Sequence, residues 1–132
     1  MTLKANVLVI DDELVILKSC KKILPEKGYD VQTVQTGAEG LQKLAQENFD
    51  MVLTDLMMPE ISGMEILERC MKTFPDIIVI MITGYTTVQT AVETMKIGAY
   101  GYIPKPFTPE ELVEAIDRAL EKKRHDKGPI SP

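Results

Sequence analysis

The sequence has no excess of basic residues, and this excludes a general attraction to polyanions. Fifteen Lys and Arg residues stand against twenty Asp and Glu residues, so the net charge is −5. We therefore expect no direct binding to nucleic acid or to an anionic membrane. No apolar run approaches the roughly 20 residues of a membrane span. The N-terminus also lacks a charged segment followed by an apolar one, so the expected location is cytoplasmic.

The chain is equally poor in residues for thiol and metal–thiolate chemistry. It contains two cysteines and one histidine. Cys20 and Cys70 are far apart in the sequence, and neither belongs to a C-x-x-C motif or lies near His125. This spacing gives no support to a zinc site or a redox pair. We expect both cysteines to be reduced and mostly buried, because a free cysteine packs as a small hydrophobic residue.

Short β-rich apolar runs alternate with longer helical stripes along the chain. The expected strands cover residues 7–10, 30–34, 51–54, 77–82 and 100–103. The first, third and fourth runs are almost continuous Val, Ile, Leu and Met, which is typical of central strands, whereas the second carries polar residues typical of an edge. We predict one α/β domain, doubly wound, (βα)5 and flavodoxin-like, with a five-stranded parallel sheet of order 2-1-3-4-5.

Hydroxyl residues mark the expected starts of four helices. Each is followed three residues later by Glu or Gln, which is the pattern of a capping box. The four pairs are Thr36 with Glu39, Ser62 with Glu65, Thr86 with Gln89, and Thr108 with Glu111. An apolar stripe on residues 88, 91, 92 and 95 is expected for the third of these helices. We expect residues 1–121 to form the domain and residues 122–132 to be a disordered polar tail or the start of a linker.

Chemically reactive residues follow four of the expected strands. Asp11 and Asp12 follow the first, Asp55 the third, Thr83 the fourth and Lys105 the fifth. Parallel neighbours would bring all of them to one rim, because open α/β sheets place their sites beyond the carboxyl ends of the strands. Adjacent acids repel one another unless a cation joins them, and Mg²⁺ prefers such oxygen ligands. The pattern therefore predicts a Mg²⁺ site, with Lys105 and Thr83 placed to contact an anion.

Five separated motifs lie in or beside these positions. They are VLVIDDE at residues 7–13, DLMMP at 55–59, SG at 62–63, TG at 83–84 and YIPKPF at 102–107. In this order they resemble the receiver domain of two-component response regulators, over about residues 5–121. Any one motif alone would be a weak signal, but five in order are specific. Residues 83–87 and 91–100 look most like receivers of the nitrogen-regulatory type, or those attached to hybrid sensor kinases.

The resemblance implies a phosphoacceptor signalling domain and not an enzyme with turnover. Asp55 would take a phosphoryl group from a histidine kinase or a phosphotransfer protein. The cofactor would be Mg²⁺, held by Asp11, Asp12, Asp55 and the main-chain carbonyl of Met57. No output module is visible in the sequence, so the output domain or target protein is unknown. Phosphorylation-dependent homodimerisation is a possible consequence.

The resemblance also assigns residues around the phosphoryl group. Lys105 would neutralise charge on the phosphoryl oxygens, and the bond between Lys105 and Pro106 would be cis, a form realistic only before proline. Thr83 would hydrogen-bond the product. Gly84 leaves room for its backbone N–H to approach the same anion, as the backbone at Met57 would. Tyr102 would turn inward as Thr83 moves, changing a surface formed by the fourth helix, fifth strand and fifth helix.

Three other interpretations compete with a phosphorylated switch. A Mg²⁺-dependent phosphohydrolase with an Asp nucleophile usually carries Asp-x-Asp-x-Thr after one strand, which the run at residues 11–13 lacks. A flavodoxin-like mononucleotide binder would need a phosphate loop where this chain has three acids that repel phosphate. An unphosphorylated interaction domain of the same fold would not need the full set of Asp, Thr and Lys.

Overall fold

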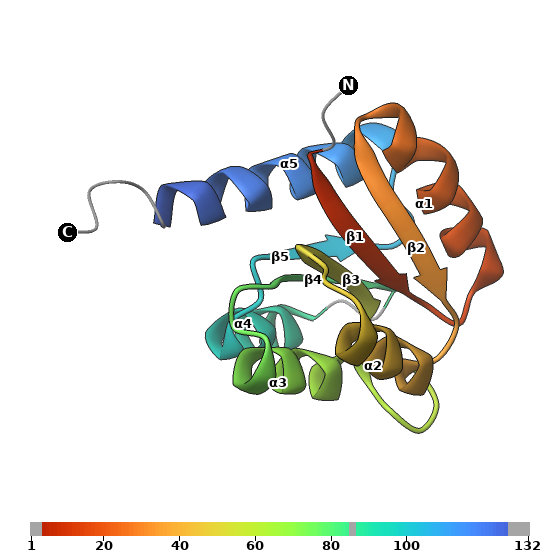
Figure 1. The fold of residues 1–132 in the computed structure, drawn as a ribbon. Coiled ribbons are helices and arrows are strands. Elements are labelled where there is room, and N and C mark those ends of the chain that lie inside the picture. Colours follow the sequence, from red (N-terminus) through yellow and green to blue (C-terminus); the bar gives the residue numbers. More distant parts are fainter. Residues whose placement is uncertain (1–3, 85–86, 127–132) are drawn as a thin grey trace.

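The computed structural model describes residues 4–84 and 87–126, in which five strands alternate with five helices (Figure 1). The strands are β1 (Ala5–Ile10), β2 (Tyr29–Val34), β3 (Met51–Asp55), β4 (Ile78–Thr83) and β5 (Gly101–Pro104). The helices are α1 (Leu14–Glu26), α2 (Gly37–Gln46), α3 (Gly63–Thr73), α4 (Val88–Ile97) and α5 (Pro109–Asp126). None of the helices in these ranges is long and apolar enough to cross a membrane.

The strands form one parallel sheet in the order β2-β1-β3-β4-β5, which confirms the predicted topology. The unbroken apolar strands β1, β3 and β4 are the central ones, and the more polar β2 is an edge. The register aligns the strand ends, because Ile10 lies opposite both Val34 and Thr54, and Thr83 lies opposite Pro104. Residues that follow these ends therefore meet at one rim of the sheet.

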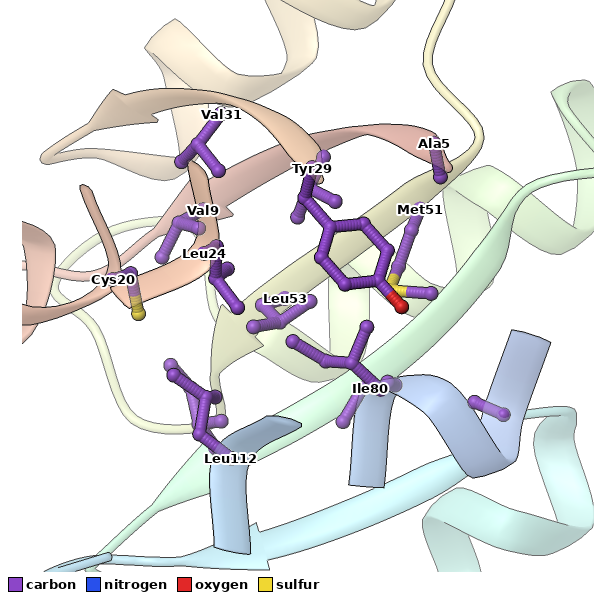
Figure 2. Packing of buried hydrophobic residues seen from close by; sticks show 14 of the residues in the cluster. Ala5, Val9, Cys20, Leu24, Tyr29, Val31, Met51, Leu53, Ile80 and Leu112 are labelled. Atoms are coloured by element: carbon purple, nitrogen blue, oxygen red, sulfur yellow. The ribbon is translucent and has the colours of Figure 1, made fainter. Parts of the chain in front are cut away.

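Each face of the sheet is covered by its own group of helices. Successive side chains of a strand point to opposite faces, so Val7 and Val9 join one core while Leu8 and Ile10 join the other. The first core packs under α1 and α5, with Leu24 and Leu112 among its members, and Figure 2 shows this side of the sheet. The second core packs under α2 and α3. Two apolar layers thus hold the central strands in place.

Hydroxyl side chains cap the N-termini of the helices largely as the sequence predicts. Thr36 and Ser62 accept hydrogen bonds from the backbone N–H groups of Glu39 and Glu65, at 3.1 and 3.3 Å. Thr108 and Glu111 form a full capping box, with bonds of 3.1 and 2.8 Å. Glu13 is the N-cap residue of α1, and its side chain makes no capping hydrogen bond.

The predicted start of α4 is wrong by one residue. Thr87 is the N-cap, and the capping box pairs it with Thr90 and not with Gln89. Thr86, the predicted cap, lies outside the described residues. The apolar stripe of this helix also faces away from the core, because Val88 is 83% exposed, and Val92 and Met95 are exposed as well.

Helix α5 continues past the expected domain end to Asp126. The last turns are anchored to Tyr100, whose hydroxyl donates to the carboxylate of Asp126 at 3.1 Å and whose ring lies 5.3 Å from the ammonium of Lys123. Lys, Arg and Glu are also good helix formers. Residues 122–126 are therefore helical, whereas a disordered tail or the start of a linker is expected from residue 122, and residues 127–132 lie outside the described part of the chain.

Burial of the two cysteines predicts a loss of stability at alkaline pH. Both are fully buried, and burial raises the pKa of Cys20 to about 12 and that of Cys70 to about 11. Near pH 9 the unfolded thiols lose a proton that the folded thiols keep, so rising pH favours unfolding. We expect each thiol to lower the free energy of unfolding by about 1.4 kcal/mol between pH 8 and pH 10.

Urea unfolding at pH 8 and pH 10 measures this effect. Cys70→Ala should remove about half of the pH dependence that the thiols cause, even though the cavity lowers stability at both pH values. An unchanged difference between the two pH values in Cys70→Ala would contradict the assignment.

Candidate functional site

The residues predicted to share a rim do meet at the carboxyl end of the sheet. Asp11 follows β1, Asp55 ends β3, Thr83 ends β4 and Lys105 follows β5. Since β1, β3, β4 and β5 are consecutive neighbours in the sheet, residues 94 positions apart in the sequence reach one site. Asp12 lies beside Asp11 in the loop that leads into α1. The apolar strands place these polar groups, because each group lies at the end of its strand or directly after it.

Three carboxylates gather at the centre of this rim. Asp11, Asp12 and Asp55 each offer an oxygen, and these oxygens all lie within 4.8 Å of one another. Asp11 is fully buried and Asp55 is 5% exposed, while Asp12 is exposed to solvent. The Oδ2 atom of Asp11 is fully buried. Three carboxylates that each offer a hard oxygen donor within this distance fit a small divalent cation such as Mg²⁺.

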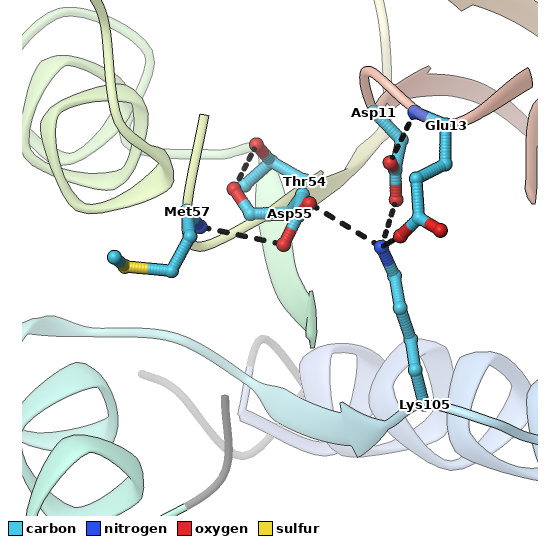
Figure 3. A network of polar contacts seen from close by, with 6 residues as sticks. All are labelled: Asp11, Glu13, Thr54, Asp55, Met57 and Lys105. Atoms are coloured by element: carbon cyan, nitrogen blue, oxygen red, sulfur yellow. Dashed lines mark hydrogen bonds and ion pairs between the residues drawn. The ribbon is translucent and has the colours of Figure 1, made fainter. Parts of the chain in front are cut away.

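Lys105 supplies the positive charge of the site (Figure 3). Its Nζ atom lies 2.8 Å from Oδ2 of Asp11, 3.3 Å from Oδ2 of Asp55 and 2.5 Å from Oε1 of Glu13. The Lys105 side chain is only 10% exposed. One ammonium group is therefore shared by three carboxylates.

The pKa values of Asp11 and Lys105 are both raised, for different reasons. Burial raises the pKa of Asp11, and this effect outweighs the opposing influence of Lys105 and of the Glu13 backbone N–H. Burial by itself would lower the pKa of Lys105, but the carboxylates of Asp11, Glu13 and Asp55 outweigh it and raise that pKa. Lys105 is consequently a permanent cation at neutral pH.

The loop from β3 to α3 closes tightly behind Asp55. The backbone N–H of Met57 donates to Oδ1 of Asp55 at 3.3 Å, and the N–H of Gly63 donates to the carbonyl of Leu56 at 3.0 Å. A Cβ atom at Gly63 would lie 2.1 Å from the carbonyl oxygen of Asp55. Only glycine allows this approach, so Gly63 helps to place the carboxylate of Asp55.

Thr83 and Tyr102 occupy the side of the site nearest to α4. Thr83 is buried at the end of β4, and its carbonyl accepts a hydrogen bond from the backbone N–H of Lys105 at 2.8 Å. Tyr102 is half-buried on β5, with its hydroxyl 3.3 Å from Oγ1 of Thr90. Gly84 is exposed, and the position of a Cβ there would be open. The peptide bond between Lys105 and Pro106 is cis.

One member of the site has no role in the predictions from the sequence. Glu13 belongs to the acidic run after the first strand, but the sequence does not predict its pairing with Lys105. Its backbone N–H donates to Oδ1 of Asp11 at 2.9 Å, which turns the chain so that its side chain can reach Lys105. A local signal for this residue is that the run Asp11–Glu13 before α1 has no Glu or Gln at the spacing of a capping box.

Comparison with known families identifies the domain. A family model described as the response regulator receiver domain matches residues 7–117. This chain belongs to the response regulator receiver family. Phosphoaspartate and Mg²⁺ are general features of such receiver domains, which interact with histidine kinases and output domains.

Relatives of this receiver domain are found among both curated proteins and solved structures. The response regulator MprA of Mycobacterium sp. (strain KMS) is 34% identical over 96% of this chain and 55% of MprA. The DNA-binding transcriptional regulator NtrC of Rhizobium meliloti (strain 1021) is 37% identical over 91% of this chain and 25% of NtrC. A CheY-like receiver domain protein from Methanospirillum hungatei JF-1 has a crystal structure with a TM-score of 0.87, at 38% identity over 95% of this chain and 99% of that one.

The share of each relative that this chain covers limits which properties of the relative can be assigned to it. The chain spans about half the length of MprA and a quarter of NtrC, so the activities of those longer proteins are not assigned to it. The CheY-like protein matches over almost its whole length. Placement among nitrogen-regulatory or hybrid-kinase receivers stays a prediction.

Proposed function

We propose that this receiver domain is a signalling switch that is phosphorylated on Asp55 with the help of Mg²⁺. The observation that supports this most directly is the meeting of Asp11, Asp12 and Asp55 within 4.8 Å, beside the ammonium of Lys105. Phosphoryl transfer needs positioning and neutralisation of spread-out charge more than covalent chemistry from the protein. This rim offers a carboxylate as the acceptor, acids for a cation and a fixed positive charge.

The residues divide the work of accepting the phosphoryl group. Asp11, Asp12, Asp55 and the main-chain carbonyl of Met57 would hold Mg²⁺, which when bound offsets negative charge on phosphoryl oxygens. A carboxylate oxygen of Asp55 attacks the phosphorus of the phosphohistidine donor, so that a P–O bond to Asp55 forms as the P–N bond of the donor breaks and its imidazole leaves. The backbone N–H of Met57, now on Oδ1 of Asp55, orients that carboxylate.

Lys105 and the end of β4 would hold the product. Lys105 contacts Asp55 before the reaction, so its ammonium is already placed to pair with a phosphoryl oxygen. The hydroxyl of Thr83, which ends the neighbouring strand β4, and the backbone N–H of Gly84, which follows it, would donate to the other oxygens. The new group adds about −1.5 to −2 charge, which this set of donors has to balance.

The signal would leave the site through α4. Tyr102 contacts Thr90, and Thr90 also receives the backbone N–H of Thr87 in the cap of α4, at 3.2 Å. If Thr83 moves toward the phosphoryl group and Tyr102 follows it inward, the contact between Tyr102 and Thr90 is lost. The exposed apolar side chains of α4 then offer a surface formed with β5 and α5 for an output domain or target protein.

The proposed partners follow from this chemistry. The phosphodonor would be a histidine kinase or a phosphotransfer protein, and a phosphorylation-dependent homodimer is one form the output could take. A cytoplasmic location agrees with these partners. Neither nucleic acid nor a membrane is proposed as a direct partner of a domain with a net charge of −5.

Incubation with acetyl phosphate and Mg²⁺, followed by intact mass spectrometry, tests the proposal. We expect the wild type to gain one phosphoryl group, Asp55→Asn to gain none, and chelation of Mg²⁺ to abolish the reaction, because the acceptor and its cation are then missing. Asp30→Asn is the matched control, since Asp30 is an exposed carboxylate on the edge strand β2 and should leave the adduct unchanged.

Two outcomes would contradict the proposed switch. If wild type gained no phosphoryl group, or if Asp55→Asn gained as much as wild type, Asp55 would not be the acceptor. Continuous release of phosphate from a phosphate ester over many turnovers would instead favour the phosphohydrolase.

A further inference from the structure

We propose that Glu13 holds Lys105 while Asp55 is unphosphorylated and yields this ammonium to the arriving phosphoryl group. Glu13 is in this sense a positioning residue, because it acts through Lys105. The inference rests on the proposed function, since it assumes that a phosphoryl group arrives on Asp55. It adds a role for Glu13, which competes with the phosphoryl group for Lys105, and the receiver motifs do not assign this role.

The three carboxylates around Lys105 differ sharply in exposure. The side chains of Asp11 and Asp55 are 0% and 7% exposed, and both come directly from strand ends. The Glu13 side chain is 54% exposed, although its Oε1 atom makes the shortest of the three contacts, at 2.5 Å. Glu13 is therefore the partner that can leave Lys105 and be solvated by water.

Hydrogen bonds fix the backbone of Glu13, whereas its side chain is not used for capping the helix. The residue is the N-cap of α1, yet its side chain accepts no capping hydrogen bond. Its backbone N–H is bound to Asp11, and its carbonyl accepts the N–H groups of Ile16 and Leu17 at 3.1 and 3.3 Å. These bonds fix where the side chain starts, and the described contacts of its carboxylate are with Lys105.

The energetics of the three pairs favour exchange at Glu13. Breaking one of the buried pairs would leave a charge without compensation in a site of low dielectric constant, which is costly. Releasing an exposed carboxylate costs little, because water and salt replace much of the attraction. A phosphoryl group carries more charge than a carboxylate and forms stronger charge-assisted hydrogen bonds, so it displaces Glu13 from Lys105.

This competition has two consequences of opposite sign. Glu13 occupies Lys105 and thereby weakens binding of a phosphoryl group. Its negative charge close to the acids also favours binding of the divalent cation. Removing the charge of Glu13 should therefore strengthen binding of the phosphoryl group and weaken binding of the divalent cation. A loss of local structure would not have these two opposite effects.

Calorimetric titration of Glu13→Gln with Mg²⁺, and with beryllofluoride at saturating Mg²⁺, tests the inference. Beryllofluoride is a phosphoryl analogue that binds an aspartate. We expect about threefold tighter beryllofluoride binding and about twofold weaker Mg²⁺ binding than in the wild type, within the range that a surface ion pair supports. Glu26→Gln, which removes an exposed carboxylate from the other end of α1, should change neither.

The outcomes separate this inference from the proposed function. A wild type that binds beryllofluoride, together with Glu13→Gln that binds it equally or more weakly, would overturn the role of Glu13 alone. A wild type that binds no beryllofluoride would overturn the phosphoryl site and the role of Glu13 together. Glu13→Ala, measured in the same way, should reproduce the effect of Glu13→Gln, since both remove the charge.

Discussion

Replacing Gly63 with Ala is expected to lower the free energy of unfolding by about 3 kcal/mol, because the new methyl group would overlap the backbone. Its Cβ atom would lie 2.1 Å from the carbonyl oxygen of Asp55 and 2.9 Å from the Cα atom of Leu56. These are backbone atoms, so no side-chain rotation can relieve the overlap. The loop has to move, and Asp55 moves with it.

Urea unfolding of Gly63→Ala, with Gly84→Ala as the control, measures this effect. Gly84 is also beside the site, but an added Cβ there meets no atom within 4 Å. Gly84→Ala should change stability by less than about 1 kcal/mol, in either direction. Slower phosphorylation by acetyl phosphate is expected for Gly63→Ala at temperatures where it remains folded. Equal stability of the two variants would show that the loop adapts without cost.

Replacing Lys105 with Met is expected to lower the free energy of unfolding by about 3 kcal/mol when no divalent cation is present. Met has a similar length but no charge, so Asp11 would be left fully buried without its cationic partner. Removing one member of a buried ion pair costs more than the pair contributes, because the remaining charge is isolated.

Addition of Mg²⁺ separates this electrostatic effect from a loss of packing. A cation that binds only the folded state raises its stability, and the acids of Lys105→Met no longer share their charge with an ammonium. We expect Mg²⁺ to stabilise Lys105→Met more than the wild type in thermal unfolding. Arg118→Met removes an exposed pair with Glu114 and should cost less than about 1 kcal/mol. A similar loss in both variants would contradict the special role of the buried pair.

The start of α4 depends on more than the local sequence pattern. Thr86 and Thr87 both carry a hydroxyl, and the usual rule favours Thr86 because Gln89 stands three residues later. The structure uses Thr87 because Thr90 completes the box with its own hydroxyl and also reaches Tyr102 on β5. The choice thus depends on a strand that lies twelve residues further along the chain.

The apolar stripe of α4 illustrates the same limit. Spacing predicts which side chains share a helix face, but it does not tell whether that face meets the sheet or the solvent. Here Thr94 is the buried residue of α4, with its hydroxyl satisfied by the carbonyl of Ala91 at 2.9 Å, and Val88 faces outward. Only the packing of α4 beside the sheet decides this.

Local sequence patterns predict the number of strands and their positions along the chain, most of the helix starts and the identity of the residues at the rim. These features are local, because a run of apolar residues forms a strand, a hydroxyl caps a helix, and a polar residue ends an apolar run. The tertiary structure alone decided that Glu13 reaches Lys105 and that Gly63 touches the carbonyl of Asp55. The first contact joins positions 92 residues apart, and the second closes the loop between β3 and α3. Both distances depend on how the sheet and its loops pack.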